Sequence, residues 1–388
     1  MFSERTRWDL RPNRLAERLA ARRAAGARLL DLTESNPTRA GLRCPDGLLE
    51  SLSRPPARLY EPSPFGLPAA RAAAAADFAR RGFPVSVERV VLSASTSEAY
   101  AFLFKLLCDP GDEVLVPRPG YPLFEFLATL ESVRVRGYPL VHDGRWSIDL
   151  AALRALVSPR TRAVVVVNPG NPTGAYLRSE ELDALEALCA ERGLALVSDE
   201  VFADFSFRED PGRAASVARD GPALAFALGG LSKSCGLPQL KLAWTAVTGP
   251  PRLVADALAR LEVVADTYLS VSTPVQVAAP DLLARREDLQ APLRERVAGN
   301  LRALRSALGP GSPATLLEPE GGWSAVLRVP ATSTEEERVT RLLDERDVLV
   351  HPGYFFDFPH EAFLVLSLLP PPADFAEGVA RVLADAVL

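Results

Sequence analysis

Lysine is nearly absent from this sequence of 388 residues. Only Lys105, Lys233 and Lys241 occur among 44 Lys and Arg residues, so almost all positive charge is supplied by arginine. Arginine stays protonated at ordinary pH, whereas a lysine amine that has lost its proton can attack a carbonyl. Two of the three lysines lie in LGGLSKSCGLPQLKLAW (228–244). The stretch is compatible with chance retention of lysine and with a nucleophilic lysine.

Cysteine and histidine are also scarce. The four cysteines, Cys44, Cys108, Cys189 and Cys235, have no paired spacing. This predicts buried thiols in a reducing compartment, without disulfides or a zinc site. The three histidines are scattered, and we expect no metal. No apolar run reaches about 18 residues, so no membrane span is predicted.

Neither the charge nor the N-terminus indicates a special partner or destination. The net charge of −5 argues against nucleic acid or an anionic membrane as the main partner. Residues 1–30 are rich in Arg and Ala, as transit peptides are, but they include Glu4, Asp9 and Glu17 and little serine. A helix over 13–25, ended by Gly26, is the better prediction, in a cytoplasmic protein.

Short apolar runs alternate with helical patterns in the central region. Strands are predicted at 89–94, 112–117, 161–169, 194–200 and 224–232, with helices at 95–107, 121–130 and 179–193. Continuous Val, Ile and Leu runs are typical of parallel strands buried on both faces. The predicted fold class is therefore α/β, with a mostly parallel central sheet sandwiched by helices.

The pattern changes after about residue 280. Helices are predicted at 286–308, 333–346 and 374–386, and strands at 321–330, 348–353 and 362–369. These elements indicate a smaller α+β unit that packs against the N-terminal helix. The expected division gives residues 1–46 and 289–388 to a small domain and residues 47–288 to a large one.

Polar loops follow four of the predicted strands, with the sequences SAST, NPGNPTG, SDEVF and SKSCG. Ligands of parallel sheets bind at the carboxyl ends of the strands, so we expect these loops to converge on one crevice. Each loop also has a purely structural interpretation. Asn171 suits a tight turn, Asp199 an ion pair or helix cap, and Ser95 a helix cap.

Taken together, the loops suggest one cofactor. They supply an amine (Lys233), a buried carboxylate (Asp199), a positioned amide (Asn171) and a helix N-terminus able to bind phosphate. Pyridoxal 5′-phosphate (PLP) has a matching aldehyde, ring nitrogen, phenolic oxygen and phosphate.

Six ordered motifs extend this match. They are YEPSPFGLPAAR (60–71), PRPGYPLF (117–124), NPGNPTG (168–174), SDEVFADF (198–205), SKSCGLPQLKLAW (232–244) and VHPGYFF (350–356). Along nearly its whole length the sequence resembles the class I/II, aspartate aminotransferase-like PLP enzymes of fold type I. The resemblance implies the fold type I architecture, a large PLP-binding domain and a small domain built from both termini.

The resemblance also implies a role for each matching residue. Lys233 would form the Schiff base with PLP and move the proton between the substrate α-carbon and cofactor carbon C4′. Asp199 would keep the pyridine nitrogen protonated, Asn171 would bond oxygen O3′, and Tyr121 would stack on the ring. The phosphate would be held by Ser95, Thr96, Ser97, Ser232 and Lys241. Tyr60 would reach the phosphate of the neighbouring subunit, in a homodimer with shared active sites.

Two departures from the family pattern lie in the cofactor site. Phe202 stands where most relatives have a tyrosine that bonds O3′. This predicts that the Schiff base keeps its proton to higher pH than in relatives with the tyrosine. Lys241 stands where relatives have a phosphate-binding arginine, so a point charge replaces a bidentate fork.

A third departure concerns the substrate. Val365, in LVLS (364–367), stands where relatives have the arginine that grips the substrate α-carboxylate. Arg328 is our candidate for a substitute cation, and amides near Asn36 and Asn171 are the alternative. Trp323 is a candidate for the apolar wall of the substrate site.

The leading functional prediction is a ping-pong aminotransferase that moves an amino group between an amino acid and a 2-oxo acid. A C–S lyase acting by β-elimination is the alternative on the same scaffold, because PLP supplies the carbanion chemistry for both. A non-catalytic PLP-binding regulatory module is the third possibility. The sequence leaves open which amino acid and oxo acid react.

Overall fold

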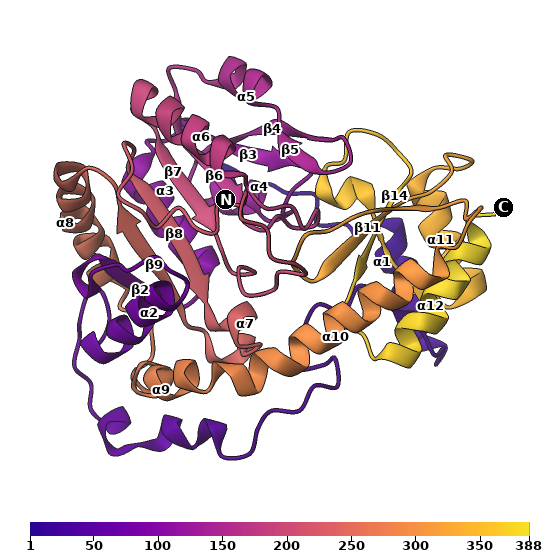
Figure 1. Ribbon diagram of the computed structural model, residues 1–388, viewed down its shortest axis with the longest axis horizontal. Helices are drawn as coiled ribbons and strands as arrows, with labels where there is room; N and C mark the ends of the chain where they lie inside the picture. Colours follow the sequence, from indigo (N-terminus) through magenta and orange to yellow (C-terminus); the bar gives the residue numbers. More distant parts are fainter. Residues whose placement is uncertain (388) are drawn as a thin grey trace.

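The computed structural model describes residues 1–387 and has a large sheet and a smaller sheet side by side (Figure 1). The strand order of the large sheet is β2-β9-β8-β7-β6-β3-β4-β5. The bounds are β2 (Val90–Ser93), β3 (Glu113–Arg118), β4 (Arg134–His142), β5 (Trp146–Ile148), β6 (Thr161–Val167), β7 (Ala195–Asp199), β8 (Ala225–Gly230) and β9 (Ala243–Thr248). Only β9 and β5 run against the others, which confirms the predicted mostly parallel sheet.

Helices cover both faces of the large sheet. One face packs against α2 (Pro68–Arg80), α5 (Leu150–Leu156), α6 (Ser179–Arg192) and α9 (Thr273–Ala284). The other packs against α3 (Thr96–Leu107), α4 (Phe124–Leu130) and α8 (Pro251–Tyr268). In β6, Val164 and Val166 join the first cluster, while Ala163 and Val165 join the second. The strand is apolar at successive positions because both its faces are buried.

The smaller sheet has the order β10-β11-β14-β13. Its strands are β10 (Thr315–Leu317), β11 (Ser324–Arg328), β13 (His351–Pro352) and β14 (Phe363–Ser367), and the parallel pair β1 (Leu30–Asp31) and β12 (Val348–Leu349) lies nearby. The accompanying helices are α1 (Arg14–Ala24), α10 (Arg286–Ala307), α11 (Glu335–Arg346) and α12 (Pro372–Asp385). The pairing of β1 with β12 joins the N-terminal segment to the C-terminal part of the chain.

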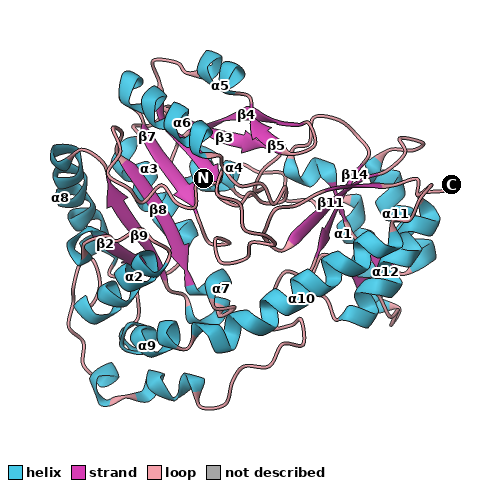
Figure 2. Cartoon of the chain, in the orientation of Figure 1, coloured by secondary structure: helices cyan, strands magenta, loops and turns pink. Residues whose placement is uncertain are grey.

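The long helix α10 connects the two units, reaching from the underside of the large sheet to the smaller one (Figure 2). It continues unbroken through residues 288 and 289. The division into 1–46, 47–288 and 289–388 therefore stays a prediction. The remaining helical segments are short. One is a single α turn, α7 (Leu231–Ser234). The others are the 3-10 helices η1 (Glu4–Thr6), η2 (Leu48–Ser53), η3 (Pro55–Arg58), η4 (Val87–Arg89), η5 (Pro238–Leu240) and η6 (Gly353–Phe356).

Two details of the sequence prediction have clear outcomes. The N-terminal helix is confirmed: the Asn13 side chain caps it by accepting from the Ala16 N–H, and Gly26 follows with φ of 72°. The prediction that all four thiols are buried holds for Cys189 and Cys235, whereas Cys108 is only half-buried and Cys44 is exposed. Cys44 lies in an irregular surface segment before η2, where no apolar layer covers it. None of the described helices is long and apolar enough to cross a membrane.

Candidate active site

The carboxyl ends of β6, β7 and β8 lie level with one another. Val167 pairs with Asp199, and Asp199 pairs with Leu228. The alignment continues past the strands, since the Asn168 N–H donates to the Asp199 carbonyl at 2.8 Å and the Glu200 N–H to the Leu228 carbonyl at 2.9 Å. The loops that carry Asn171, Asp199 and Lys233 therefore start from adjacent points on one edge of the sheet.

The antiparallel strand β9 brings Lys241 to the same edge. Ala243 pairs with Ser93 of β2 on one side and with Gly230 of β8 on the other. Lys241 comes two residues before β9, Ser95 two residues after β2 and Ser232 two residues after β8, and the Leu231 N–H donates to the Leu242 carbonyl at 3.0 Å. Three residues predicted to bind phosphate thus lie next to the ends of three neighbouring strands.

This place has the features of an anion site. The backbone N–H groups of Ser95, Thr96 and Ser97, in the first turn of α3, donate to no acceptor within residues 1–387. Lys241 likewise has no carboxylate within ion-pair distance in that range. The Ser95 hydroxyl is a helix cap, accepting from the Glu98 N–H at 3.2 Å, so the capping interpretation is also correct. Free N–H groups and an unpaired cation at a helix start fit a phosphate.

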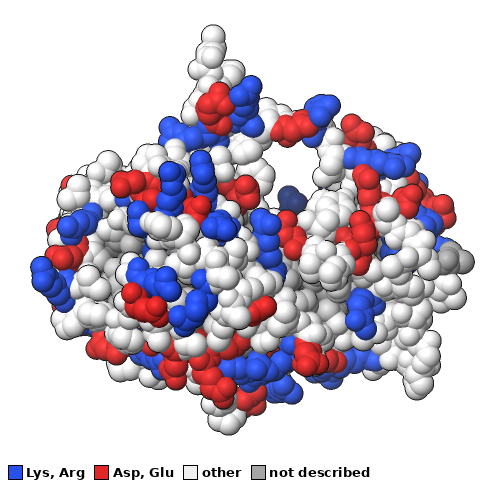
Figure 3. All heavy atoms as spheres, turned by 90° about the horizontal axis from the view of Figure 1, so that it is seen from above, with Lys and Arg blue, Asp and Glu red and all other residues white. Residues whose placement is uncertain are grey.

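The surface is hollowed between the two units. Figure 3 shows an opening between the larger and smaller parts of the molecule, with basic side-chain atoms visible at its depth. Basic and acidic side chains are interspersed over the rest of that face.

Asp199 is a buried carboxylate without a cationic partner. It is 7% exposed and accepts two hydrogen bonds, from the Val201 N–H at 3.2 Å and from the Tyr100 hydroxyl at 3.3 Å. No Lys or Arg of residues 1–387 lies within ion-pair distance of it. Burial raises the pKa of its carboxyl to about 6, and the two hydrogen bonds oppose this rise.

The ion pair expected near this position belongs to the next residue instead. Glu200 pairs with Arg81 at 3.0 Å and accepts from the Ser216 hydroxyl and the Val217 N–H. Because Glu200 takes this structural role, the charge of Asp199 remains available for a ligand.

Lys233 lies on the single helical turn α7, not in an irregular loop as its Ser- and Gly-rich surroundings suggest. Its Nζ is 5.7 Å from the ring centre of Phe202 and 5.1 Å from that of Trp323. Burial lowers the pKa of the ammonium, and Asp199 opposes this shift. A lower pKa increases the fraction of neutral amine, the form that attacks carbonyls and accepts protons.

The two asparagines of NPGNPTG have different roles. Asn168 is fully buried and structural: its amide donates to the Ala214 carbonyl at 2.7 Å and accepts from the Leu177 N–H at 3.0 Å. The Asn171 side chain makes no hydrogen bond inside the described chain, and it is half-buried. Asn171 is thus free to bond a ligand, as predicted.

The Asn171 loop is fixed against the smaller unit. Gly174 has φ of 68°, and a Cβ there would meet the Gly321 carbonyl oxygen at 2.6 Å, so only glycine fits. The Glu320 and Gly321 N–H groups both donate to the Gly174 carbonyl. The position of Asn171 therefore depends on contacts from both units.

Aromatic side chains line the site. Tyr121 packs edge-on against Phe124 at 5.7 Å, and its phenol pKa is raised to about 12 by burial and by the charge of Asp199. Trp323 contacts Phe202 at 5.3 Å, also edge-on. Tyr121, Phe202 and Trp323 thus surround the space beside Asp199 and Lys233.

Comparison with known proteins agrees with this geometry. The family model of class I and II aminotransferases matches residues 29–382. The chain belongs to this family. Alanine aminotransferase of Mycobacterium tuberculosis is 30% identical over 373 residues, covering 92% of this chain and 85% of that protein. Glutamate-pyruvate aminotransferase AlaA of Escherichia coli is 32% identical over 257 residues, 65% of this chain and 63% of that protein.

The fold has close structural counterparts. The crystal structure of an aminotransferase from Escherichia coli superposes with a TM-score of 0.88 at 24% identity, covering 100% of this chain and 98% of that one. This superposition confirms the predicted fold type I architecture. The match to the family model and the identity to the Mycobacterium tuberculosis enzyme confirm the predicted aminotransferase family.

The structure separates the candidate substrate residues. Asn36 lies near the Lys233 segment, since its neighbour Pro37 is 3.5 Å from where a Cβ of Gly236 would be. Its amide oxygen is occupied by the Thr38 N–H and hydroxyl. Arg328 is exposed at the far end of β11, five residues beyond Trp323, or about 16 Å along an extended strand. The aminotransferase does not bring Arg328 to Lys233.

Val365 is enclosed by apolar side chains. It is 2% exposed and clusters with Trp146, Leu317, Val326, Phe356, Phe358 and Phe363. The residue paired with it on β13 is His351, and burial lowers the imidazole pKa, so this ring is neutral at pH 7. The aminotransferase has no fixed positive charge at this position.

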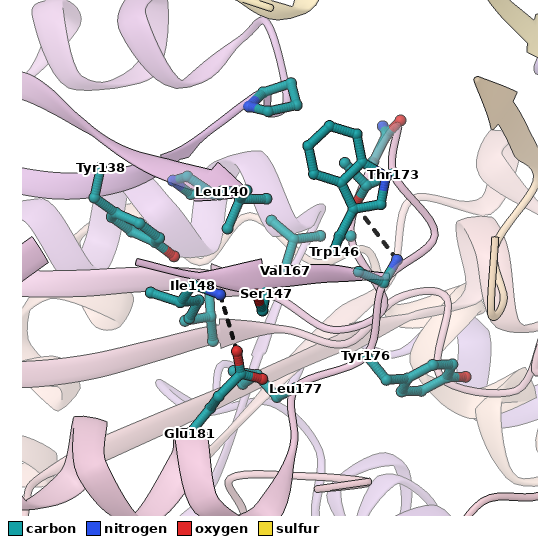
Figure 4. Close-up of a pocket in the computed structure, with 16 residues that line it drawn as sticks. Tyr138, Leu140, Trp146, Ser147, Ile148, Val167, Thr173, Tyr176, Leu177 and Glu181 are labelled. Atoms are coloured by element: carbon teal, nitrogen blue, oxygen red, sulfur yellow. Dashed lines mark hydrogen bonds between the residues drawn. The ribbon is translucent and has the colours of Figure 1, made fainter. Parts of the chain in front are cut away.

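An apolar pocket lies beside the Asn171 loop (Figure 4). The β4–β5 hairpin supplies Tyr138, Leu140, Trp146 and Ile148 to its wall. Its carboxylate, Glu181, already accepts from the Ile148 N–H at 2.9 Å and the Arg178 N–H at 2.8 Å. The pocket therefore offers space for an apolar group and no free charge.

Tyr100 is a neighbour of the site that the sequence did not reveal. It lies on α3 among Phe, Leu and Ala, a pattern typical of a helix core. The Tyr100 hydroxyl contacts Asp199. One tyrosine on an apolar helix face is only weak sequence evidence for a functional residue.

The first prediction concerns Asp199 in the cofactor-free protein. Its folded pKa of about 6 lies above the ordinary value. The contribution of Asp199 to stability is therefore greatest below about pH 4, is lost as pH rises through about 6, and stays lower above that. Asp199→Asn should stabilise the apoprotein by about 3 kcal/mol at pH 8 and by nothing near pH 4. Urea unfolding across this pH range measures the difference. A pH-independent effect would contradict it.

The second prediction concerns Val365. Val365→Arg should destabilise the enzyme by at least about 3 kcal/mol, because no carboxylate lies in the cluster to pair with the guanidinium. Val365→Leu, the apolar control, should cost about 1 to 2 kcal/mol. Denaturant unfolding of both variants provides the test. Equal stability of Val365→Arg and wild type would show that the position is open to solvent or to a hidden counter-charge.

Proposed function

We propose that this aminotransferase binds PLP at the edge of the large sheet and moves an amino group between an amino acid and a 2-oxo acid. The observation that carries the proposal is Asp199, a buried carboxylate with two neutral donors and no cation. A buried charged carboxylate is stabilised by a cation that pairs with it, and a protonated pyridine ring would supply one. The bound cofactor acts as an electron sink for the substrate α-carbon.

The chain's own residues divide the remaining tasks. The free N–H groups of Ser95, Thr96 and Ser97, with Ser232 and Lys241, would hold the phosphate. Asn171 would donate to the phenolic oxygen, and Tyr121 and Phe202 would border the ring. Lys233 would bind the cofactor through its amine and would serve as the general base for the substrate α-proton, aided by its lowered pKa.

We further propose a homodimer in which Tyr60 completes the neighbouring site. Tyr60 is 72% exposed and its neighbour Leu59 is 62% exposed, although both are large and partly or wholly apolar. Large exposed apolar side chains in a group are typical of interaction surfaces. Leu123, Phe126 and Leu130, in and just before α4, are also exposed, although less so.

The third prediction uses the three lysines. Lys233→Arg keeps the positive charge but removes the nucleophile, and should reduce transamination by about 10³-fold or more. Lys241→Arg should retain cofactor binding, because arginine also binds phosphate. Lys105→Arg is the matched control: Lys105 pairs with Glu131 at 2.5 Å away from the site and should be silent.

The assay for this series follows the absorbance of the bound cofactor with alanine and glutamate as donors, since the named relatives suggest these two. Conversion that is reversed by a 2-oxo acid supports transamination. Release of pyruvate and ammonia from a β-substituted amino acid would identify the C–S lyase instead. Full activity of Lys233→Arg would contradict the assignment of Lys233.

The fourth prediction concerns the substrate carboxylate. Hydrogen bonds to charged groups contribute about 1.5 to 3 kcal/mol each, so a bidentate clamp discriminates strongly. 2-Phenylethylamine is phenylalanine without the carboxylate. Because Val365 provides no clamp, kcat/KM for phenylalanine should exceed kcat/KM for 2-phenylethylamine by no more than about tenfold. Arg328→Ala should leave the KM for the amino acid unchanged, because Arg328 is exposed and distant. A preference above about a hundredfold would show that another cation binds the carboxylate.

A further inference from the structure

We propose that Tyr100 is a positioning residue for Asp199, holding one carboxylate oxygen by a hydrogen bond and favouring the ionised form of that carboxylate. The inference rests on the proposed function, since it concerns the residue assigned to the cofactor ring. The contact joins the Tyr100 hydroxyl to Asp199 Oδ2 at 3.3 Å, between residues 99 positions apart in the chain. Tyr100 is 1% exposed.

The direction of this hydrogen bond is fixed. Burial and the charge of Asp199 raise the pKa of the Tyr100 phenol well above its usual range. The phenol therefore keeps its proton throughout the pH range of the enzyme and is a donor toward the carboxylate. A donor to a charged oxygen stabilises the charged form.

The surroundings leave Tyr100 no other acceptor. Phe104 at 5.9 Å and Phe124 at 5.4 Å pack on its ring, and within residues 1–387 the hydroxyl bonds only to Asp199. The second carboxylate oxygen, Oδ1, accepts from the Val201 N–H. Each oxygen thus has one neutral donor, which fixes the orientation of the carboxylate and leaves its other lone pairs for a cation.

Four titratable groups face Asp199. They come from different elements: Tyr100 from α3, Tyr121 from the loop after β3, Glu200 from the adjacent position and Lys233 from α7. Tyr121 does not hydrogen-bond to Asp199, and Glu200 is neutralised by Arg81. Lys233 acts on Asp199 through its charge, without a hydrogen bond or an ion-pair contact. Of these four groups, Tyr100 is therefore the one that favours the ionised form of Asp199 by a hydrogen bond before a cofactor binds.

The first experiment measures the affinity of the apoprotein for pyridoxamine 5′-phosphate by calorimetry from pH 5 to pH 9. This probe has no aldehyde and does not react with Lys233. Tyr100→Phe should bind it about tenfold more weakly than wild type near pH 6 and within about threefold at pH 8.5. The midpoint of the acid limb should rise by about one pH unit. Protonation of the probe affects both proteins equally, so it cancels in the ratio of their affinities.

The matched control is Tyr138→Phe. Tyr138 is also 1% exposed, but its hydroxyl donates to the Val165 backbone carbonyl at 2.8 Å and touches no carboxylate. It should leave the pH midpoint in place. A loss of affinity in Tyr100→Phe that is the same at every pH, or a shift equal to that of Tyr138→Phe, would overturn the proposal. Tyr100→Leu, which also lacks the hydroxyl, should show the same shift if Tyr100→Phe folds poorly.

A second measurement needs no cofactor. The Asp199-dependent part of the unfolding free energy, taken as the difference between each apoprotein and its Asp199→Asn counterpart, should fall as pH rises to about 6 with Tyr100 and to about 7 in Tyr100→Phe. In an Asp199→Asn background the two curves should run parallel. If the probe fails to bind wild type, the proposed cofactor is wrong, while this apoprotein curve still decides whether Tyr100 controls Asp199. Identical curves in the Asp199 background would refute that control.

Discussion

The organisation of the site depends on a carboxylate that the protein buries without neutralising. Asp199 ends a strand in the middle of the large sheet, and its neighbours provide an N–H and a phenol but no cation. The adjacent Glu200 shows what the same fold does for a structural carboxylate, giving it an arginine and two further donors. The contrast between consecutive residues separates a binding group from a structural one more clearly than burial alone.

The arginine-rich composition has a related explanation. Arginine forms the structural ion pairs, as where Arg178 and Arg213 both contact Glu320 near the Asn171 loop. Its planar fork suits such bidentate and shared contacts. Lysine stands at position 233, where burial lowers the pKa of the amine, and at position 241, where no carboxylate of residues 1–387 pairs with it. The reason for lysine, not arginine, at Lys241 is not visible in its surroundings.

Much of the architecture was predictable because apolar runs and helical periodicity are local properties. The strands around 89–94, 161–169 and 194–200 and the flanking helices formed close to the predicted bounds. The antiparallel strand β9 was not predicted, although it sets the neighbourhood of Lys241, because strand order is decided by pairing between distant segments. Helices α8 and α9 were also missed, although their apolar positions pack against the sheet.

The site was predictable to a different degree in each of its parts. Asn171, Asp199 and Lys233 follow strands, and level strand ends bring such loops together in any parallel sheet. Tyr100 was missed because its position on a helix face carries no sign of what lies opposite. Arg328 was a poor candidate because its distance from the site depends on how distant strands pair. In the register of β11 with β14, Arg328 pairs with Phe363 at the end of β11.

The enclosure of Val365 bears on how substrate choice is separated from catalysis in this fold. Val365 and the β4–β5 hairpin residue Trp146 belong to one apolar cluster, whereas Lys233, Asp199 and Asn171 have no member in it. Trp146 nevertheless lines the same pocket as Asn171, so the apolar cluster borders the candidate site. An arginine at 365 would need a new counter-charge inside a cluster that includes Trp146, so the apolar cluster as a whole, and not the single valine, excludes a fixed charge from this position. The pocket beside Asn171, lined by the same hairpin, gives an apolar substituent somewhere to bind.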